Sequence, residues 1–303
     1  MGHSITTVTC NPDRHSQIKF LVRYENNQTV KTLNSELKEI NKWEHSHIWG
    51  SHSTSVIFSF DSRYIATGLI EGADQNIVKL WDTKTDKSQI FNFFNPSLLG
   101  RINLLGFTKD NKDILCIADT HIYLINLKTE TSTKTSISGQ IKSLCIYPKD
   151  DIFATGNTKG EIAIWKLTTG SAIIDTEFQA HGTPKETPIN SLAFKPKSKI
   201  LASAGDDCKI KLWDLSKKCK EEILGEHDFP INVITFSPDG KFLASGDDSG
   251  SIKIWDIWDM KTRKNGVLKK HEKAVTSLSF SPDGKTLISG SKDGNIILWK
   301  KQN

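Results

Sequence analysis

The sequence predicts an all-β protein built from one repeated unit. The stretch at 281–300, SPDGKTLISGSKDGNIILWK, recurs as SPDGKFLASGDDSGSIKIWD at 237–256 and as KPKSKILASAGDDCKIKLWD at 195–214. Each copy reads as a turn, a short apolar strand, a second turn and an alternating strand that closes on Trp. An internal period of this length determines the architecture, so it is the first feature to interpret.

Seven copies of the unit follow one another along the 303 residues. Five close on a tryptophan, and two weaker copies place Leu33 and Ile125 at that position; the tryptophans are Trp81, Trp165, Trp213, Trp255 and Trp299. A period of about 40–45 residues with turn signals and a Trp-Asp close resembles the WD40 repeat, whose fold is a β-propeller. The resemblance covers essentially the whole chain and implies a seven-bladed β-propeller.

The resemblance also implies a single domain over 1–303, because no linker or change of composition separates one unit from the next. The units are expected at about 1–46, 47–94, 95–135, 136–179, 180–224, 225–268 and 269–303.

Each unit is expected to supply its strands in order, from the inner strand outward. In unit one, SITTVTC, QIKFLVRY, TVKTL and ELKEINKW predict four strands. In unit two, LIEGADQN predicts a longer turn between the second and third strands, and in unit three KTETSTKTS predicts an outer strand in solvent. In unit five, GTPKETP is an insertion after His181.

Unit seven ends soon after Lys300, which leaves fewer residues than the roughly five of a typical strand. Blade seven is therefore expected to lack its outer strand and to leave the edge at Asn295–Trp299 open. An open edge is a template for strand addition, so a strand is expected from an upstream segment, a partner or a neighbouring molecule. A solvated edge is the alternative.

Composition excludes several classes of protein. The hydrophobic content of 37% suffices for stacked sheets, and the net charge of +5 is too mild and mixed to indicate nucleic acid by itself. No run of about 18 apolar residues predicts a membrane span, and no signal peptide precedes the first strand. The five cysteines lack metal-type spacing and indicate a reducing compartment, so the expected location is the cytoplasm.

In WD40 repeats a His, a Ser or Thr, an Asp and a Trp form a buried hydrogen-bonded chain. The resemblance assigns two complete sets, which are His271, Ser289, Asp293 and Trp299 in unit seven, and His181, Ser203, Asp207 and Trp213 in unit five. Unit six keeps His227, Ser245 and Trp255 but has Ser249 at the Asp position, and unit four keeps only Thr155 and Trp165. A catalytic triad occurs once beside a pocket, whereas this set recurs, so its role is structural.

Two other clusters of charged residues and histidines are expected to be solvated loops or strands. The stretch EHSHIWGSH, with Glu44, His45, His47 and His52, has spacing compatible with a metal but reads more simply as a loop. The basic run of Lys261, Arg263, Lys264, Lys269, Lys270 and Lys273 has no interleaved aromatic residue, so nucleic acid is not the expected partner. No phosphate loop, nucleophile elbow or zinc spacing is present, so we expect neither catalysis nor a cofactor or metal.

The residue after the first apolar position of each inner strand faces the channel mouth in WD40 propellers. The resemblance places seven mainly uncharged polar residues there: Thr6, Thr54, Asn103, Lys142, Asn190, Asn232 and Thr276. A second ring at the adjoining turns includes Asn26, Thr158, Asp206, Asp248 and Lys292. Such a mouth suits a peptide or a protein loop, although solvated residues of a narrow channel would read in the same way.

The sequence therefore predicts a non-catalytic platform that binds a protein or peptide. The near-consensus units five to seven resemble WD40 arrays of large multidomain regulators, including bacterial signalling ATPases, which favours an interaction or sensor domain of a larger protein. A separate scaffold subunit of a multiprotein complex is the alternative. A nucleic-acid-associated or enzymatic propeller is more distant.

Overall fold

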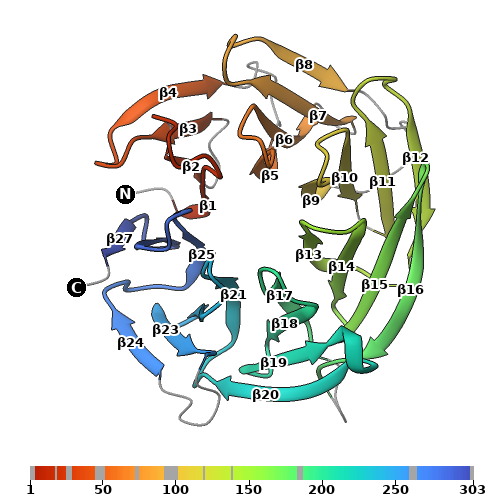
Figure 1. The fold of residues 1–303 in the computed structure, drawn as a ribbon. Helices are drawn as coiled ribbons and strands as arrows, with labels where there is room; N and C mark the ends of the chain where they lie inside the picture. The colour runs from red at the N-terminus through yellow and green to blue at the C-terminus, as the bar shows by residue number, and fades with distance from the viewer. Residues whose placement is uncertain are drawn as a thin grey trace.

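The computed structural model describes residues 4–17, 19–24, 29–44, 52–71, 75–91, 102–118, 120–137, 139–182, 187–258 and 265–300. These residues form seven antiparallel sheets arranged around a central opening, each with its strands in chain order from the inside outward (Figure 1). The fold is a seven-bladed β-propeller, which confirms the predicted fold class.

The strands of the first four blades are, in chain order, β1 Ile5–Cys10, β2 Phe20–Tyr24, β3 Thr29–Leu33 and β4 Glu39–Glu44; β5 His52–Phe58, β6 Tyr64–Glu71, β7 Gln75–Asp82 and β8 Ser88–Phe91; β9 Ile102–Phe107, β10 Asp113–Ala118, β11 His121–Asn126 and β12 Ser132–Ser136; β13 Ile141–Tyr147, β14 Ile152–Asn157, β15 Glu161–Thr168 and β16 Ser171–Gln179.

The strands of the last three blades are β17 Ile189–Phe194, β18 Ile200–Gly205, β19 Lys209–Asp214 and β20 Lys220–Glu226; β21 Ile231–Phe236, β22 Phe242–Asp247, β23 Ser251–Asp256 and β24 Asn265–Lys269; β25 Val275–Phe280, β26 Thr286–Ser291 and β27 Ile296–Lys300. A single 3₁₀ turn, η1 at Leu215–Lys217, is the helical element of the described ranges. No helix among these residues is long and apolar enough to cross a membrane.

The Ser-Pro-Asp-Gly phrase builds the turn between the first two strands of a blade. In blade seven the Ser281 hydroxyl donates to Asp283 Oδ1 at 2.6 Å and accepts from the Thr286 amide at 3.0 Å. The Gly284 amide closes the turn on the Ser281 carbonyl at 2.8 Å, with φ at +69°, where glycine carries no steric penalty. Blade six repeats these contacts at Ser237 and Asp239, which explains why the phrase recurs.

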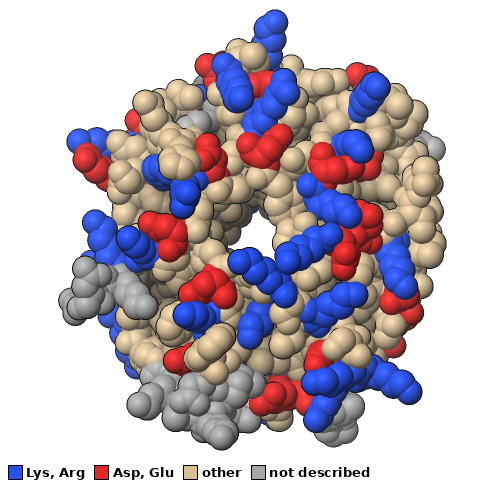
Figure 2. All heavy atoms as spheres, in the orientation of Figure 1, with Lys and Arg blue, Asp and Glu red and all other residues tan. Residues whose placement is uncertain are grey.

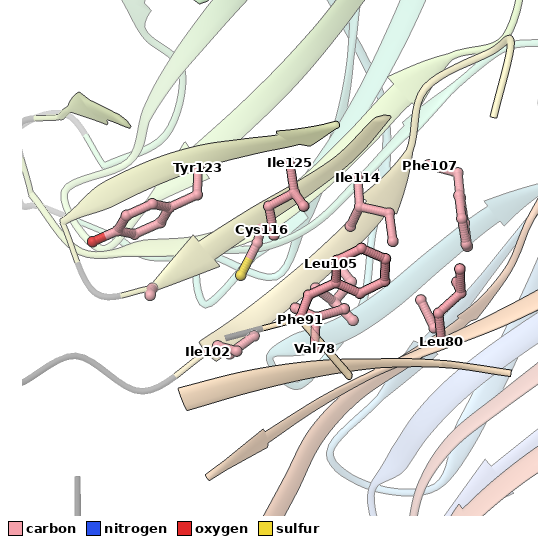
Figure 3. Packing of buried hydrophobic residues seen from close by; sticks show 12 residues of the cluster. Val78, Leu80, Phe91, Ile102, Leu105, Phe107, Ile114, Cys116, Tyr123 and Ile125 are labelled. Carbon is pink, nitrogen blue, oxygen red and sulfur yellow. The ribbon is translucent and has the colours of Figure 1, made fainter. Parts of the chain in front are cut away.

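The hydrophobic core lies between neighbouring blades. Between blades two and three, Val78 and Phe91 pack against Leu105, Ile114 and other residues of blade three (Figure 3). Every blade thus covers the apolar face of the next, as expected for stacked repeats. The ring closes where β1 packs on β25 and β26, with Ile5, Val8 and Ile288 in one buried cluster.

The predicted elements differ from the structure in one place. The second hairpin of blade two runs further than predicted, because Glu71 pairs with Gln75 across 72–74, so most of LIEGADQN is strand. The outer strands predicted in units one and three are present as β4 and β12. Blade seven has three strands among the described residues, and its outermost one is β27.

Candidate partner-binding site at the channel mouth

A hydrogen-bonded chain of histidine, serine, aspartate and tryptophan crosses blades five and seven. In blade seven, His271 Nδ1 lies 2.9 Å from Asp293 Oδ2 and His271 Nε2 lies 2.7 Å from Ser289 Oγ. The Trp299 indole N–H donates to the same Ser289 oxygen at 2.8 Å.

Blade five has the equivalent contacts. His181 lies 2.8 Å from Asp207 and 2.7 Å from Ser203, and Trp213 donates to Ser203 at 2.8 Å. Each chain ties together two strands, the turn between them and the loop that carries the histidine, so the residues that shape this face of the blade are held rigidly.

Blade six corrects the sequence analysis. Ser249 does not replace the acid; instead Asp247, two positions earlier, reaches His227 Nδ1 at 2.7 Å. Ser249 donates to Asp247 Oδ1 at 2.7 Å and so supports the acid rather than substituting for it. With Ser245 and Trp255 in their usual places, the chain is complete in this blade too.

The acids of these chains have lowered pKa values. Burial by itself would raise the pKa of Asp247, but hydrogen bonds from His227, Ser249 and the Ser251 amide outweigh burial, so the pKa falls below 3.8. The pKa values of Asp207 and Asp293 fall in the same way, since hydrogen bonds from histidine and backbone amides overcome burial. All three carboxyl groups are therefore ionised near neutral pH.

The histidine and serine side chains of the three chains have no access to a substrate. Each of these histidine side chains is 0% exposed, and Ser203, Ser245 and Ser289 are also 0% exposed. In blade four, where no histidine is available, the Trp165 indole donates directly to Thr155 at 2.9 Å.

The channel mouth carries two Asn–Asp pairs on adjacent blades. The Asn190 side-chain amide donates to Asp206 Oδ1 at 2.6 Å, and the Asn232 amide donates to Asp248 Oδ1 at 2.8 Å. Lys142, in blade four, donates to Asn190 Oδ1 at 3.4 Å. The structure thus joins Lys142, Asn190 and Asp206 into one polar network over two blades.

Comparison with known proteins agrees with this architecture. The family model described as WD domain, G-beta repeat, matches residues 43–82, 174–214, 217–256 and 262–300. The chain belongs to the WD40-repeat family. The four matches cover more than half of the chain and include the three blades with a complete His–Ser–Asp–Trp chain.

Among curated WD-repeat relatives, periodic tryptophan protein 2 of Arabidopsis thaliana is 30% identical over 57% of this chain and 19% of its own length. Mitotic checkpoint protein BUB3.1 of the same plant is 24% identical over 56% of this chain and 53% of its own. The EARP-interacting protein homolog of Gekko japonicus is 34% identical over 35% of this chain and 29% of its own. The matched part of this WD40 chain thus spans about half, or less, of these relatives.

The remaining predicted mouth residues have different surroundings. The Thr276 hydroxyl donates to the Ile5 carbonyl at 2.6 Å and so joins the last blade to the first. Thr6 exchanges hydrogen bonds with Arg23 and so joins β1 to β2 within blade one. Lys292 is exposed in the turn after β26, and Thr158 lies in the turn after β14. The side chains of Thr54 and Asn103, and all of Asn26, lie outside the described residues.

The histidine-rich stretch EHSHIWGSH, which the sequence analysis interprets as a loop rather than a metal site, lies largely outside the described residues. His45 and His47 are not described, and neither are the side chains of Glu44 and His52. Among the residues that the structure does describe, no group of three or more His, Cys, Asp or Glu could hold a metal ion. Of the basic run, Lys261, Arg263 and Lys264 are likewise outside.

One exposed aromatic residue at the mouth was missed. Phe229 is 50% exposed in the loop between β20 and β21, next to Pro230, whose carbonyl accepts the Asp248 amide at 3.0 Å. The signal was available in the sequence, because HDFP places an aromatic residue in a loop where unit seven has the polar pair Glu272 and Lys273.

Proposed function

We propose that this WD40 propeller is a non-catalytic platform that binds a protein or peptide at the channel mouth of blades four to six. The observation that carries the proposal is the pair of exposed carboxylates, Asp206 and Asp248, each oriented by a neighbouring asparagine. A carboxylate bonded at one oxygen can accept further hydrogen bonds at the other. Phe229 beside them adds an exposed apolar contact of the kind that binding surfaces use.

The proposal extends to the setting of the domain. We infer that it serves as the interaction or sensor domain of a larger regulatory protein, with a separate scaffold subunit as the alternative. The name of one relative, the EARP-interacting protein homolog, states a binding role for that protein, which supports this class of function. The five cysteines are free thiols, which agrees with a reducing location such as the cytoplasm.

The test is affinity capture with a matched pair of variants. Asp206→Asn with Asp248→Asn removes two charges at the mouth while keeping side-chain shape. The control, Glu36→Gln with Asp86→Asn, removes two charges from exposed turns on other blades. Each protein is incubated with a lysate of the source organism, and bound proteins are quantified by mass spectrometry.

We expect a protein that binds the parent and the control equally and is depleted by about tenfold on the mouth variant, as for loss of polar contacts at the centre of an interface. Equal recovery on all three proteins would show that the mouth is not the binding face.

A further inference from the structure

A second charged surface lies on the face opposite the mouth. The inner strands begin at the mouth, so the turns that follow them lie at the other end of the channel. In blades three to six these turns carry seven lysines, and one of them, Lys112, pairs with Asp110 of its own turn at 2.9 Å. The other six are here called the lysine arc: Lys109, Lys149, Lys195, Lys197, Lys199 and Lys241. Figure 2 shows Lys and Arg side chains gathered along the right and lower rim of the central opening, over β9, β13 and β17.

The lysine arc is continuous from blade to blade. Lys109 in blade three lies 3.1 Å from Asp151 in blade four, and Lys199 in blade five lies 3.9 Å from Asp150. Between blades five and six the Lys195 stem packs on the next turn, since a Cβ built on Gly240 would lie 3.5 Å from Lys195 Cε. The four turns therefore form one surface rather than four separate patches.

Positive charge is in excess at the centre of the arc. The blade-five turn at 195–199 has three lysines and no acid. Within the described ranges, Lys149, Lys195 and Lys197 form no ion pair with a carboxylate, whereas Lys109 and Lys199 do. Unpaired ammonium groups brought close together by the fold attract an anionic partner.

An exposed aromatic residue lies at each end of the arc. Trp258 is 78% exposed, and the Lys241 ammonium lies 5.4 Å from the centroid of its ring. At the other end Phe60 is 41% exposed, and its amide donates to Asn111 in the blade-three turn at 2.9 Å. Exposed Trp and Phe beside lysines are typical of sites that bind chains with both acidic and apolar residues.

We propose that the lysine arc, with Trp258 and Phe60 at its ends, binds an acidic peptide segment of a partner protein. The acids in the same four turns would repel the evenly spaced charges of a nucleic-acid backbone. They are Asp110, Asp150, Asp151 and Asp239. A peptide can avoid them, because it places its carboxylates at intervals and its apolar side chains against the aromatic residues. This surface is separate from the mouth, so the propeller holds two partners on opposite faces.

Fluorescence anisotropy with a labelled Glu-rich peptide containing Phe tests the proposal. The main variant is Lys195→Glu with Lys197→Glu. Its control is Lys38→Glu with Lys42→Glu, which makes the same change of charge at two exposed positions of blade one, a blade that carries no residue of the arc or of its ends. A second variant, Trp258→Ala, leaves the net charge unchanged, and thermal melting verifies that each protein is folded.

We expect the arc variant to bind the peptide about tenfold more weakly, because two charges at the centre of the arc are reversed, and the control to bind within about twofold of the parent. Trp258→Ala should bind about threefold more weakly, with an unchanged salt dependence between about 50 and 300 mM. Three outcomes overturn the proposal: no binding by the parent, equal losses in the arc variant and its control, or tighter binding of a single-stranded RNA than of the peptide. Because the probe does not involve the mouth, these results are independent of the capture experiment.

Discussion

At the residue scale, the buried histidines stabilise blades five, six and seven through two hydrogen bonds apiece. His271→Ala leaves Asp293 and Ser289 without their partner, and we expect the free energy of unfolding to fall by about 1–3 kcal/mol. His15→Ala, at an exposed histidine, should change it by less than about 0.5 kcal/mol. Urea denaturation compares the two, and equal losses would contradict the structural role of the chain.

Blade six allows a test of which acid completes the chain. Asp247→Ala should destabilise the protein by about 1–3 kcal/mol, because Asp247 is buried against His227. Ser249→Ala should cost only about 0.5 kcal/mol, since the serine bonds to Asp247 and Ser251 from an exposed turn and does not contact His227. Thermal melting of both variants shows whether Asp247 or Ser249 is the partner of His227. A larger loss of stability for Ser249→Ala would favour Ser249, the residue that the sequence places there.

The lowered pKa values of Asp207, Asp247 and Asp293 predict how stability depends on pH. Because these carboxyl groups hold protons less tightly in the folded state, their stabilisation is fully present above the ordinary pKa of 3.8 and is lost as pH falls through the lowered values. Urea unfolding between about pH 7 and pH 3 should show this loss. Asp247→Asn should be less stable near neutral pH and should lose less on acidification; an unchanged slope would be the contrary result.

Residue positions could be predicted where the repeat is regular and not where it shifts. Asp293 and Asp207 occupy the position that the family leads one to expect, so alignment found them. Asp247 lies two positions earlier, where unit seven has Ser291. Its carboxylate bonds Nδ1 of His227, as Asp293 bonds Nδ1 of His271 in blade seven. Alignment of the repeats compares sequence positions, whereas the histidine needs only a carboxylate oxygen within hydrogen-bond distance, which a residue two positions away can also supply.

At the scale of strands and blades, the strand order of each blade followed from the sequence. Alternation and turn residues predicted β4 and β12 even though both are polar. The extension of the blade-two hairpin to Glu71 and Gln75 was missed, because Gly72 and Asp74 signal a turn without giving its length. Where the two strands of the hairpin stop pairing depends on their backbone register, and the residue types around the turn do not determine that register.

Strand β27 is the element with the most distinctive expected behaviour. Trp299 at its end is half-buried, while Trp255 at the same place in blade six, under β24, is 3% exposed. We expect the outward amides of β27 to exchange with solvent at least about tenfold faster than those of β23, because no described strand covers them.

Hydrogen exchange read by mass spectrometry checks this, both for these 303 residues and for any longer natural protein. Slower exchange in the longer protein would support strand addition at this edge. Protection of β27 equal to that of β23 in the 303 residues alone would show that the edge is already covered.

At the scale of the whole molecule, the ring depends on close contact between its first and last blades. A Cβ on Gly290 would lie 2.5 Å from Ile5 Cγ2 and 2.8 Å from Val8 Cγ2. Gly290→Ala should therefore lower the free energy of unfolding by about 1–3 kcal/mol through overpacking. Gly266→Ala on β24, where no atom lies within 4 Å, is the control and should be nearly neutral. Calorimetry measures both, and similar melting temperatures would show that this contact adapts without cost.

The ring and its number of blades could be predicted from the period alone, whereas its surfaces could not. Seven repeats of similar length fill a closed ring, which makes the architecture insensitive to the weak units one and three. The lysine arc, by contrast, gathers residues from four turns between Lys109 and Lys241. These lysines lie close together only because neighbouring blades pack side by side around the ring axis, and the packing angle between blades cannot be read from the sequence.

Hydroxyl groups also join the inner strands of neighbouring blades, and one of these links has a consequence for how the chain folds. Ser279 Oγ accepts the amide of Cys10, 269 positions away, whereas most pairings lie within one hairpin. Hairpins form quickly and cheaply, but joining such distant positions costs the entropy of closing a very long loop. During synthesis blades one to six can assemble as an open arc before blade seven has been synthesised. One apolar face of blade one then stays exposed to solvent until β25 and β26 fold against it. The open-ring intermediate that precedes the pairing of blade one with blade seven is therefore expected to be the slowest to fold further and the most prone to aggregate.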